Sequence, residues 1–249
     1  MEWNLITGIF SSGWVMNEED SMKALHHAYF DLGIHTFDTA NVYTQGQSER
    51  VVGKFLKKYS IPREHVVILT KACFPTEGLP HELAATVRNN TKGLSRKNLF
   101  ASLESSLERL GVDYVDLFQI HRFDPETPVD ETMEALHDLV KSGKVRYIGA
   151  SSMYLYQFAK VRCISALLIF HALPDFFYFP TQMQYTAELR GWTKFVSMQN
   201  LWNLLYREEE REMVPFCKEQ GIALIPYSPL ASGALTRPAS YYFILFSTP

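Results

Sequence analysis

Short apolar runs alternate with helix-like runs along the chain, and this alternation restricts the fold more than any other feature of the sequence. Six runs have the length and the β-branched or aromatic content of strands, and most are apolar on both faces. They span residues 35–40, 66–71, 115–120, 146–151, 195–200 and 222–227. Buried strands that alternate with helices form a parallel sheet with right-handed crossovers. The sequence therefore predicts an α/β fold, either an open sheet or a (β/α)8 barrel.

Capping residues mark the ends of three helices between these strands. Asn17 precedes an acidic first turn, and Ser95 begins a second helix that ends at Gly111. A third helix is expected to begin with Pro128 at its first position and to end at Gly143. The first helix carries an apolar stripe made of Met22, Leu25, Tyr29 and Leu32. We expect these apolar faces to pack against the sheet.

Composition narrows the class of protein. Apolar residues make up 47% of the chain and charged residues 20%, which is enough for one large core. A net charge of −3 offers no basic surface for nucleic acid. Cys73, Cys163 and Cys217 have neither metal-ligand spacing nor the pattern of a disulfide framework. No basic n-region opens the sequence, so we expect no secretory signal and a cytoplasmic enzyme with no metal, no membrane span and no nucleic-acid partner.

Residues 161–182 do not fit the alternation. They read VRCISALLIFHALPDFFYFPTQ, with many aromatic residues and no helical period, and Pro174 and Asp175 interrupt the run too early for a membrane span. One interpretation is an inserted lid, because long loops are often functional. The other is a retained intron, since the segment can be encoded from GT to AG, keeps the reading frame and leaves a normal spacing between strands when removed. We favour the retained intron.

Four polar side chains stand where the predicted strands end. Asp38 and Lys71 close the first two strands, Tyr43 lies in the loop after Asp38, and His121 follows the third strand. Alone, each has an ordinary structural explanation as a cap, a packing residue, a snorkelling cation or a strand-end histidine. Together they suit proton transfer, because a tyrosine with a pKa of about 10 needs a cation to become an effective acid. Lys71 can supply that cation, Asp38 can orient it, and His121 can donate to a carbonyl oxygen.

The sequence around these residues is similar to those of the aldo-keto reductases, and most similar to their aryl-alcohol dehydrogenase and potassium-channel β-subunit-like branch. The matching blocks are FDTANVYTQGQSERVVGKFLKK, VVILTK, VDLFQIHRFD, VRYIGASSM and FVSMQNLWNLLYREEEREMVPFCKEQGIALIPYSPLASGALTRP. They run in family order from Val15 to Pro238, outside residues 161–182. The resemblance implies a (β/α)8 barrel that uses NADP(H) to reduce an aldehyde or ketone to an alcohol. The channel subunits carry a different residue in place of His121, so the chain resembles the enzymes more.

The resemblance also implies a role for each residue. Tyr43 would be the general acid, Lys71 paired with Asp38 would lower the pKa of Tyr43, and His121 would orient the small carbonyl substrate. The nicotinamide carboxamide would be held by Ser151, Ser152 and Gln199. The nicotinamide ring would stack on Tyr227. The pyrophosphate would be approached by Ser228, Leu230 and Ser232.

The chain also departs from the family. MEWNLITGIFSSGW stands in place of the first barrel strand, and the tail 239–249 is unlike the eighth strand and the basic segment that grips the adenosine 2′-phosphate. We therefore expect one domain over residues 1–249, an incomplete barrel with about six of the eight strands, and impaired activity. The alternative is a non-catalytic binding or regulatory protein of aldo-keto reductase type, or an inactive mis-spliced product.

Overall fold

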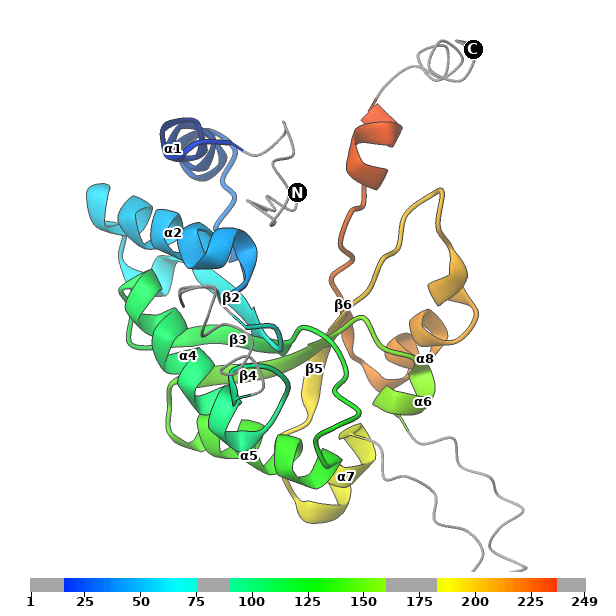
Figure 1. The fold of residues 1–249 in the computed structure, drawn as a ribbon. Coiled ribbons are helices and arrows are strands. Elements are labelled where there is room, and N and C mark those ends of the chain that lie inside the picture. Colours follow the sequence, from blue (N-terminus) through cyan, green and yellow to red (C-terminus); the bar gives the residue numbers. More distant parts are fainter. Residues whose placement is uncertain (1–15, 76–89, 160–182, 237–249) are drawn as a thin grey trace, which may run out of the picture.

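The computed structural model describes residues 16–75, 90–159 and 183–236 (Figure 1). Within these ranges six parallel strands form one sheet, in the order β1 to β6. The strands are β1 (Thr36–Asp38), β2 (Val67–Ala72), β3 (Val115–Ile120), β4 (Val145–Ser151), β5 (Phe195–Gln199) and β6 (Ala223–Leu224). All six start within one residue of their predicted positions. This six-stranded half-barrel confirms the prediction of an incomplete α/β barrel. Residues 161–182 and the tail 239–249 lie outside the described residues.

Helices follow one another along one face of the sheet (Figure 1). The α-helices are α1 (Glu18–His26), α2 (Gln47–Lys58), α4 (Arg96–Leu110), α5 (Val129–Lys141), α6 (Leu155–Phe158), α7 (Met183–Arg190) and α8 (Met213–Gln220). A π-helical segment, η1 (His27–Asp31), extends α1, and short 3-10 helices occur at η2 (Tyr43–Gly46), η3 (Arg63–His65), η6 (Glu208–Glu210) and η7 (Ala231–Thr236). Helices α1, α2, α4, α5 and α7 each contact the next in the series. This row of helices covers the sheet as the outer layer of a barrel would.

The core lies between the sheet and this row of helices. Ile68, Phe118 and Ile148 have no exposed surface and lie on the helix side of their strands. On the other face of the sheet Tyr147 is 59% exposed and Val67 is 43% exposed. The helix-covered face therefore supplies most of the apolar burial, while the face that carries Lys71 is partly open.

The helix ends show which capping predictions hold. The side chain of Asn17 accepts a hydrogen bond from the Asp20 N–H at 2.9 Å, and Ser95 accepts one from the Asn98 N–H at 3.3 Å, which confirms both N-caps. Gly111 ends α4 with φ at 65°, in the left-handed region that glycine adopts without strain. Pro128 is corrected by one position: it is extended and precedes the first helical residue, Val129.

The predicted apolar stripe of the first helix is wrong at its last member. Leu25 is buried, and Met22 and Tyr29 pack against the core as expected. Leu32, however, is 50% exposed. The chain changes from α-helix to π-helix over His27–Asp31, and the wider π turn rotates the following residues away from the stripe.

Candidate active site

The site forms at the carboxyl ends of the first three strands. Asp38 is the last residue of β1, Lys71 is the fifth residue of β2, and His121 follows β3 directly. Because these strands are parallel neighbours, their carboxyl ends share one edge of the sheet. The structure therefore brings together the residues that the sequence places on three separate strands.

Tyr43 lies in a constrained turn after β1. Its N–H donates to the Ala40 carbonyl at 3.1 Å, and Thr44 and Gln45 follow with φ values of 50° and 55°. Left-handed backbone at non-glycine residues costs on the order of 1–3 kcal/mol per residue, so surrounding contacts must hold the turn. The Tyr43 ring centroid lies 5.0 Å from the Lys71 ammonium and 5.8 Å from the His121 ring. The turn thus places the phenol between a cation and an imidazole.

Lys71 is a fully buried cation with close partners. Its Nζ donates to Asp38 Oδ2 at 2.7 Å and to the Thr39 carbonyl at 2.9 Å. Burial is the largest influence on the pKa of Lys71 and lowers it, but the Asp38 carboxylate and the Tyr43 phenol outweigh burial and raise this pKa above its usual value. Lys71 is therefore positively charged at neutral pH.

Two amides complete the surroundings of Asp38. Gln119 Nε2 donates to Asp38 Oδ1 at 3.2 Å, and Gln199 Nε2 lies 3.3 Å from Asp38 Oδ2. Gln119 was not predicted as a site residue, although an amide within the apolar run VDLFQI is a visible signal. Gly149 makes room for it, because a Cβ there would lie 3.1 Å from Gln119 Cγ. Gln199, expected at the cofactor, points toward Asp38.

His121 is a neutral, buried histidine. Its backbone N–H donates to the Ala72 carbonyl at 2.9 Å, and its ring meets Phe74 edge-on at 5.4 Å between centroids. Burial is the main cause that lowers the pKa of His121, with Lys71 and Arg122 adding to it, and the pKa falls to about 3. The imidazole therefore carries no charge at neutral pH and can donate one hydrogen bond.

Acidification should destabilise the protein through His121. Between pH 6.5, the usual pKa, and about 3, the unfolded chain binds a proton on this histidine that the folded chain does not bind. Stability then falls by about 1.4 kcal/mol per pH unit as the pH falls through this window. Urea unfolding at several pH values should give a flatter dependence for His121→Gln. The exposed His65→Gln is the control, and parallel curves for His121→Gln and wild type would contradict the pKa assignment.

The predicted carboxamide-binding residues cluster at the next two strand ends. Ser151, the last residue of β4, is buried, and its hydroxyl donates to the Gln199 carbonyl at 2.7 Å. Ser152 has a left-handed φ of 48°, and its N–H contacts Asn200 Oδ1 at 2.8 Å. Asn200, which was not among the predicted site residues, also donates to Glu209 at 2.6 Å. Its place immediately after Gln199 was the available signal.

Tyr227, predicted to stack on the nicotinamide, and the three residues predicted at the pyrophosphate follow β6. Tyr227 bridges to Leu201 in parallel pairing, and its N–H donates to the Asn200 carbonyl at 3.0 Å, which attaches it to the end of β5. The Ser228 carbonyl accepts from Asn203 Nδ2 at 2.9 Å. Leu230 is 48% exposed, and Ser232 has φ at 54° within η7. The backbone of Tyr227 therefore joins the ends of β5 and β6.

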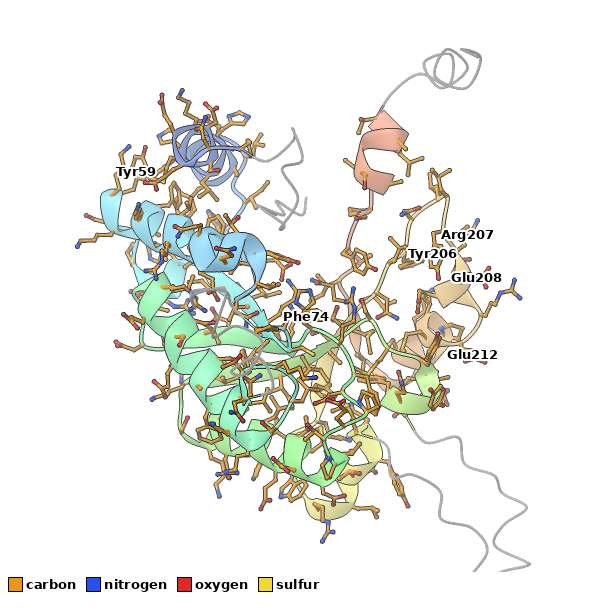
Figure 2. All side chains as sticks on the ribbon, in the orientation of Figure 1. Tyr59, Phe74, Tyr206, Arg207, Glu208 and Glu212 are labelled. Carbon is orange, nitrogen blue, oxygen red and sulfur yellow. The ribbon has the colours of Figure 1, made fainter. Side chains whose placement is uncertain are left out.

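The loop after β5 is the exposed side of this region. Leu204 and Leu205 are 77% and 68% exposed. Tyr206 and Arg207 lie on the β5–α8 side of the molecule, and Phe74 lies near its centre (Figure 2). The Phe74 ring lies 5.4 Å from the His121 ring between centroids, so Phe74 is part of the site at the strand ends.

Near the carboxyl ends of β1 and β3, three buried polar atoms have no hydrogen-bond partner among the described residues. They are Asn41 Oδ1, Gln119 Oε1 and His121 Nδ1. Gln119 and His121 belong to β3 and its end, and the Asn41 side chain donates to the Phe74 carbonyl at 3.1 Å. A buried polar atom without a partner is costly, and a bound polar molecule can satisfy it. The strand ends thus fit a polar small molecule, including the amide of a nicotinamide.

Comparison with known proteins assigns the family. The model of the aldo/keto reductase family matches residues 4–240, a wider range than the motifs covered, and the chain belongs to this family. It is 51% identical over 241 residues to an aldo-keto reductase of Fusarium vanettenii. It is 46% identical over 253 residues to a Schizosaccharomyces pombe protein named as an aryl-alcohol dehydrogenase, and 47% identical over 234 residues to versiconal hemiacetal acetate reductase of Aspergillus parasiticus.

The chain is shorter than these relatives. The matches cover 91%, 94% and 91% of this chain, but only 59%, 65% and 61% of the respective relative. Within residues 16–75, 90–159 and 183–236, no helix has the length and apolar character to cross a membrane. The same residues contain no group of three or more His, Cys, Asp or Glu side chains suited to a metal ion.

Proposed function

We propose that this protein is an NADPH-dependent reductase of aldehydes or ketones. The observation that carries the proposal is the Lys71 ammonium, held by Asp38 at 2.7 Å and placed 5.0 Å from the centroid of the Tyr43 ring. A phenol beside a buried ammonium is suited to giving up its proton, because the cation stabilises the phenolate that remains. Membership of the aldo/keto reductase family supports the same chemistry.

In this proposal Tyr43 gives its phenolic proton to the carbonyl oxygen of the substrate. Lys71 stabilises the phenolate, and Asp38 keeps Lys71 charged and oriented. General acid catalysis of this kind contributes about 10²–10⁴-fold to a rate. His121 is neutral, so its ring N–H donates a hydrogen bond that orients the carbonyl oxygen without bringing a second positive charge.

The substrate side of the site contains an aromatic side chain. Phe74 is 39% exposed and contacts the His121 ring, so its open face can pack against an apolar substrate. The exposed ring supports an aryl or aliphatic carbonyl compound rather than a highly charged one. The three cysteines, which have neither metal-ligand spacing nor the pattern of a disulfide framework, support a reducing, cytoplasmic setting.

NADP(H), when bound, supplies the hydride. The resemblance assigns Ser151, Ser152 and Gln199 to the carboxamide and Tyr227 to the face of the nicotinamide. Ser228, Leu230 and Ser232 would approach the pyrophosphate. The position of Ser151, Gln199 and Tyr227 at the ends of neighbouring strands supports the first part of this assignment. Gln199 Nε2 lies 3.3 Å from Asp38, a long contact that a bound amide could replace.

Two assays on one preparation test the proposed function. NADPH fluorescence is measured during titration with the protein, and NADPH absorbance is then followed with a panel of aryl and aliphatic aldehydes. We expect binding together with carbonyl-dependent loss of absorbance. Binding without turnover would replace the reductase with a non-catalytic binding protein of the same family. Absence of binding by a folded protein would overturn both.

We also propose that residues 161–182 derive from a retained intron. Their departure from the strand–helix alternation supports this origin. Sequencing of the transcript across codons 158–185 tests it. A message without the segment is the expected result, and a mature message that always keeps it would favour the inserted lid.

A further inference from the structure

A buried ion pair lies behind the Tyr43 turn. Glu49, in the first turn of α2, has no exposed surface. Its Oε2 accepts from Arg109 Nε at 2.6 Å, and its Oε1 accepts from the Thr70 hydroxyl at 2.5 Å. The Arg109 side chain is 10% exposed and also donates to Ser106 at 3.2 Å. One carboxylate therefore joins three elements, α2, β2 and α4.

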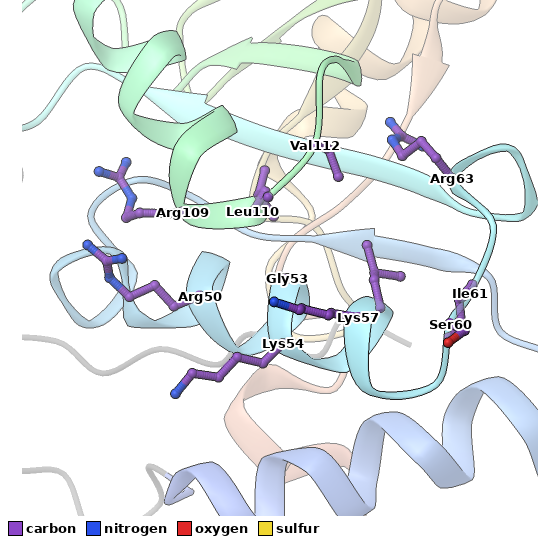
Figure 3. A pocket seen from close by; sticks show the side chains of 12 residues that line it. Arg50, Gly53, Lys54, Lys57, Ser60, Ile61, Arg63, Arg109, Leu110 and Val112 are labelled. Carbon is purple, nitrogen blue, oxygen red and sulfur yellow. The ribbon is translucent and has the colours of Figure 1, made fainter.

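The Arg109 side chain also packs against the end of the turn. Gly46, the last residue of η2, has φ at 83°, and a Cβ there would lie 2.5 Å from Arg109 Cδ and 2.7 Å from its Nε. Arg109 and Leu110, at the end of α4, lie beside Arg50 and Gly53 of α2 (Figure 3). The glycine thus allows the guanidinium to approach the backbone that follows Tyr43.

A second contact joins the residues before and after the Tyr43 turn. The Thr39 and Ser48 hydroxyls form a buried hydrogen bond of 2.7 Å, and the Thr39 carbonyl accepts from Lys71 Nζ. Thr70 and Lys71 are adjacent and point to opposite faces of β2, so Thr70 meets Glu49 while Lys71 meets Asp38. The buried pair therefore fixes both the strand that carries the lysine and the helix that follows the tyrosine.

We propose that Glu49 and Arg109 are positioning residues that hold the Tyr43 turn in place, with its phenol beside the Lys71 ammonium. A buried ion pair is weak evidence for stability, because apolar replacements are often as stable. Here the pair lies next to two residues with left-handed backbone, where the turn needs external support. The catalytic part of this inference rests on the proposed reductase function.

A control pair of the same chemistry lies near the amino-terminal ends of β2 and β3. Arg63 NH2 contacts Asp116 Oδ2 at 2.5 Å, with side chains 17% and 24% exposed, and Asp116 also accepts from the Ile68 N–H. This pair joins the amino-terminal parts of β2 and β3, away from Tyr43. It shares the chemistry of the Glu49–Arg109 pair but has no contact with the turn in the described residues.

Double variants allow the test without leaving an unpaired buried charge. Glu49→Gln/Arg109→Met is compared with Asp116→Asn/Arg63→Met in the same assay. We expect kcat to fall by about 10–100-fold in the first variant, because small misplacements of a catalytic group have effects of this size. NADPH affinity should stay within about twofold, and the control should keep kcat within about twofold. Equal kcat values in the two double variants and in wild type would overturn the proposal.

A second readout does not depend on turnover. Tyrosine labelled with 13C at Cζ reports ionisation of Tyr43 by NMR, with the resonance assigned by its absence in Tyr43→Phe. The midpoint should move upward by roughly one pH unit or more in Glu49→Gln/Arg109→Met, because the phenol moves away from the ammonium, and should stay unchanged in the control. An unchanged midpoint in both would refute the positioning role. Failure of wild type to oxidise NADPH would refute the reductase function alone.

Discussion

Tyr43→Phe is expected to lower the rate of carbonyl reduction by about 10²–10⁴-fold, the usual contribution of a general acid. The substitution removes the phenolic oxygen and keeps the ring that lies 5.8 Å from the His121 ring. NADPH affinity should stay within a few-fold of wild type, because the residues implied for the cofactor follow β4, β5 and β6. Initial rates and fluorescence titration on the same preparation measure the two quantities.

The control for this variant is a tyrosine away from the site. Tyr156 is 55% exposed on α6, and its ring stacks on Tyr154. Tyr156→Phe should leave both quantities unchanged. If Tyr43→Phe kept its rate within a few-fold of wild type, Tyr43 would not be the proton donor.

Lys71→Met should lower both stability and activity. The substitution leaves the Asp38 carboxylate, whose side chain is only 10% exposed, without its cation. Loss of one partner of a buried ion pair costs about 3–5 kcal/mol of unfolding free energy. Urea denaturation at neutral pH measures this loss, and the same preparation should show no reductase activity above background.

A second substitution separates the two effects of Lys71. Lys71→Met/Asp38→Asn should regain much of the lost stability, since the uncompensated charge is gone, but should remain inactive. Lys144→Met is the control for an exposed pair: Lys144 contacts Glu104 with 42% and 53% of the side chains exposed, and its loss should cost under about 1 kcal/mol. If Lys71→Met unfolded at the same midpoint urea concentration as wild type, the result would argue against a coupled buried pair.

The strands could be predicted because each is a compact apolar run between helix caps. A parallel strand buried on both faces needs little information beyond its own residues, and the β3 run VDLFQI illustrates this. The exposure of Leu32 could not be predicted in this way. A stripe of apolar residues assumes 3.6 residues per turn, and the sequence carries no local signal that His27–Asp31 adopts a π-helix.

The site was partly predictable for a related reason. Strand-end positions bring Asp38, Lys71 and His121 to one edge, so alternation of strands and helices is enough to group them. The supporting network was not predictable in this way. Glu49 reads as an acid in a helix first turn and Arg109 as a cation near a helix end, both ordinary solvent-facing features. Only the packing of α2 against α4 shows that both side chains are turned inward.

The order of the site residues along the chain has a consequence for synthesis of the protein. Asp38, Tyr43, Lys71 and His121 belong to β1, β2, β3 and the segments that follow them, while the residues implied for the cofactor begin at Ser151. Each strand of this sheet pairs with the strand made just before it. At about 5–20 residues per second, the ribosome completes the proton-transfer half several seconds before it releases the last strand. The nascent chain can therefore form the Lys71–Asp38 pair before the rest of the site has been made.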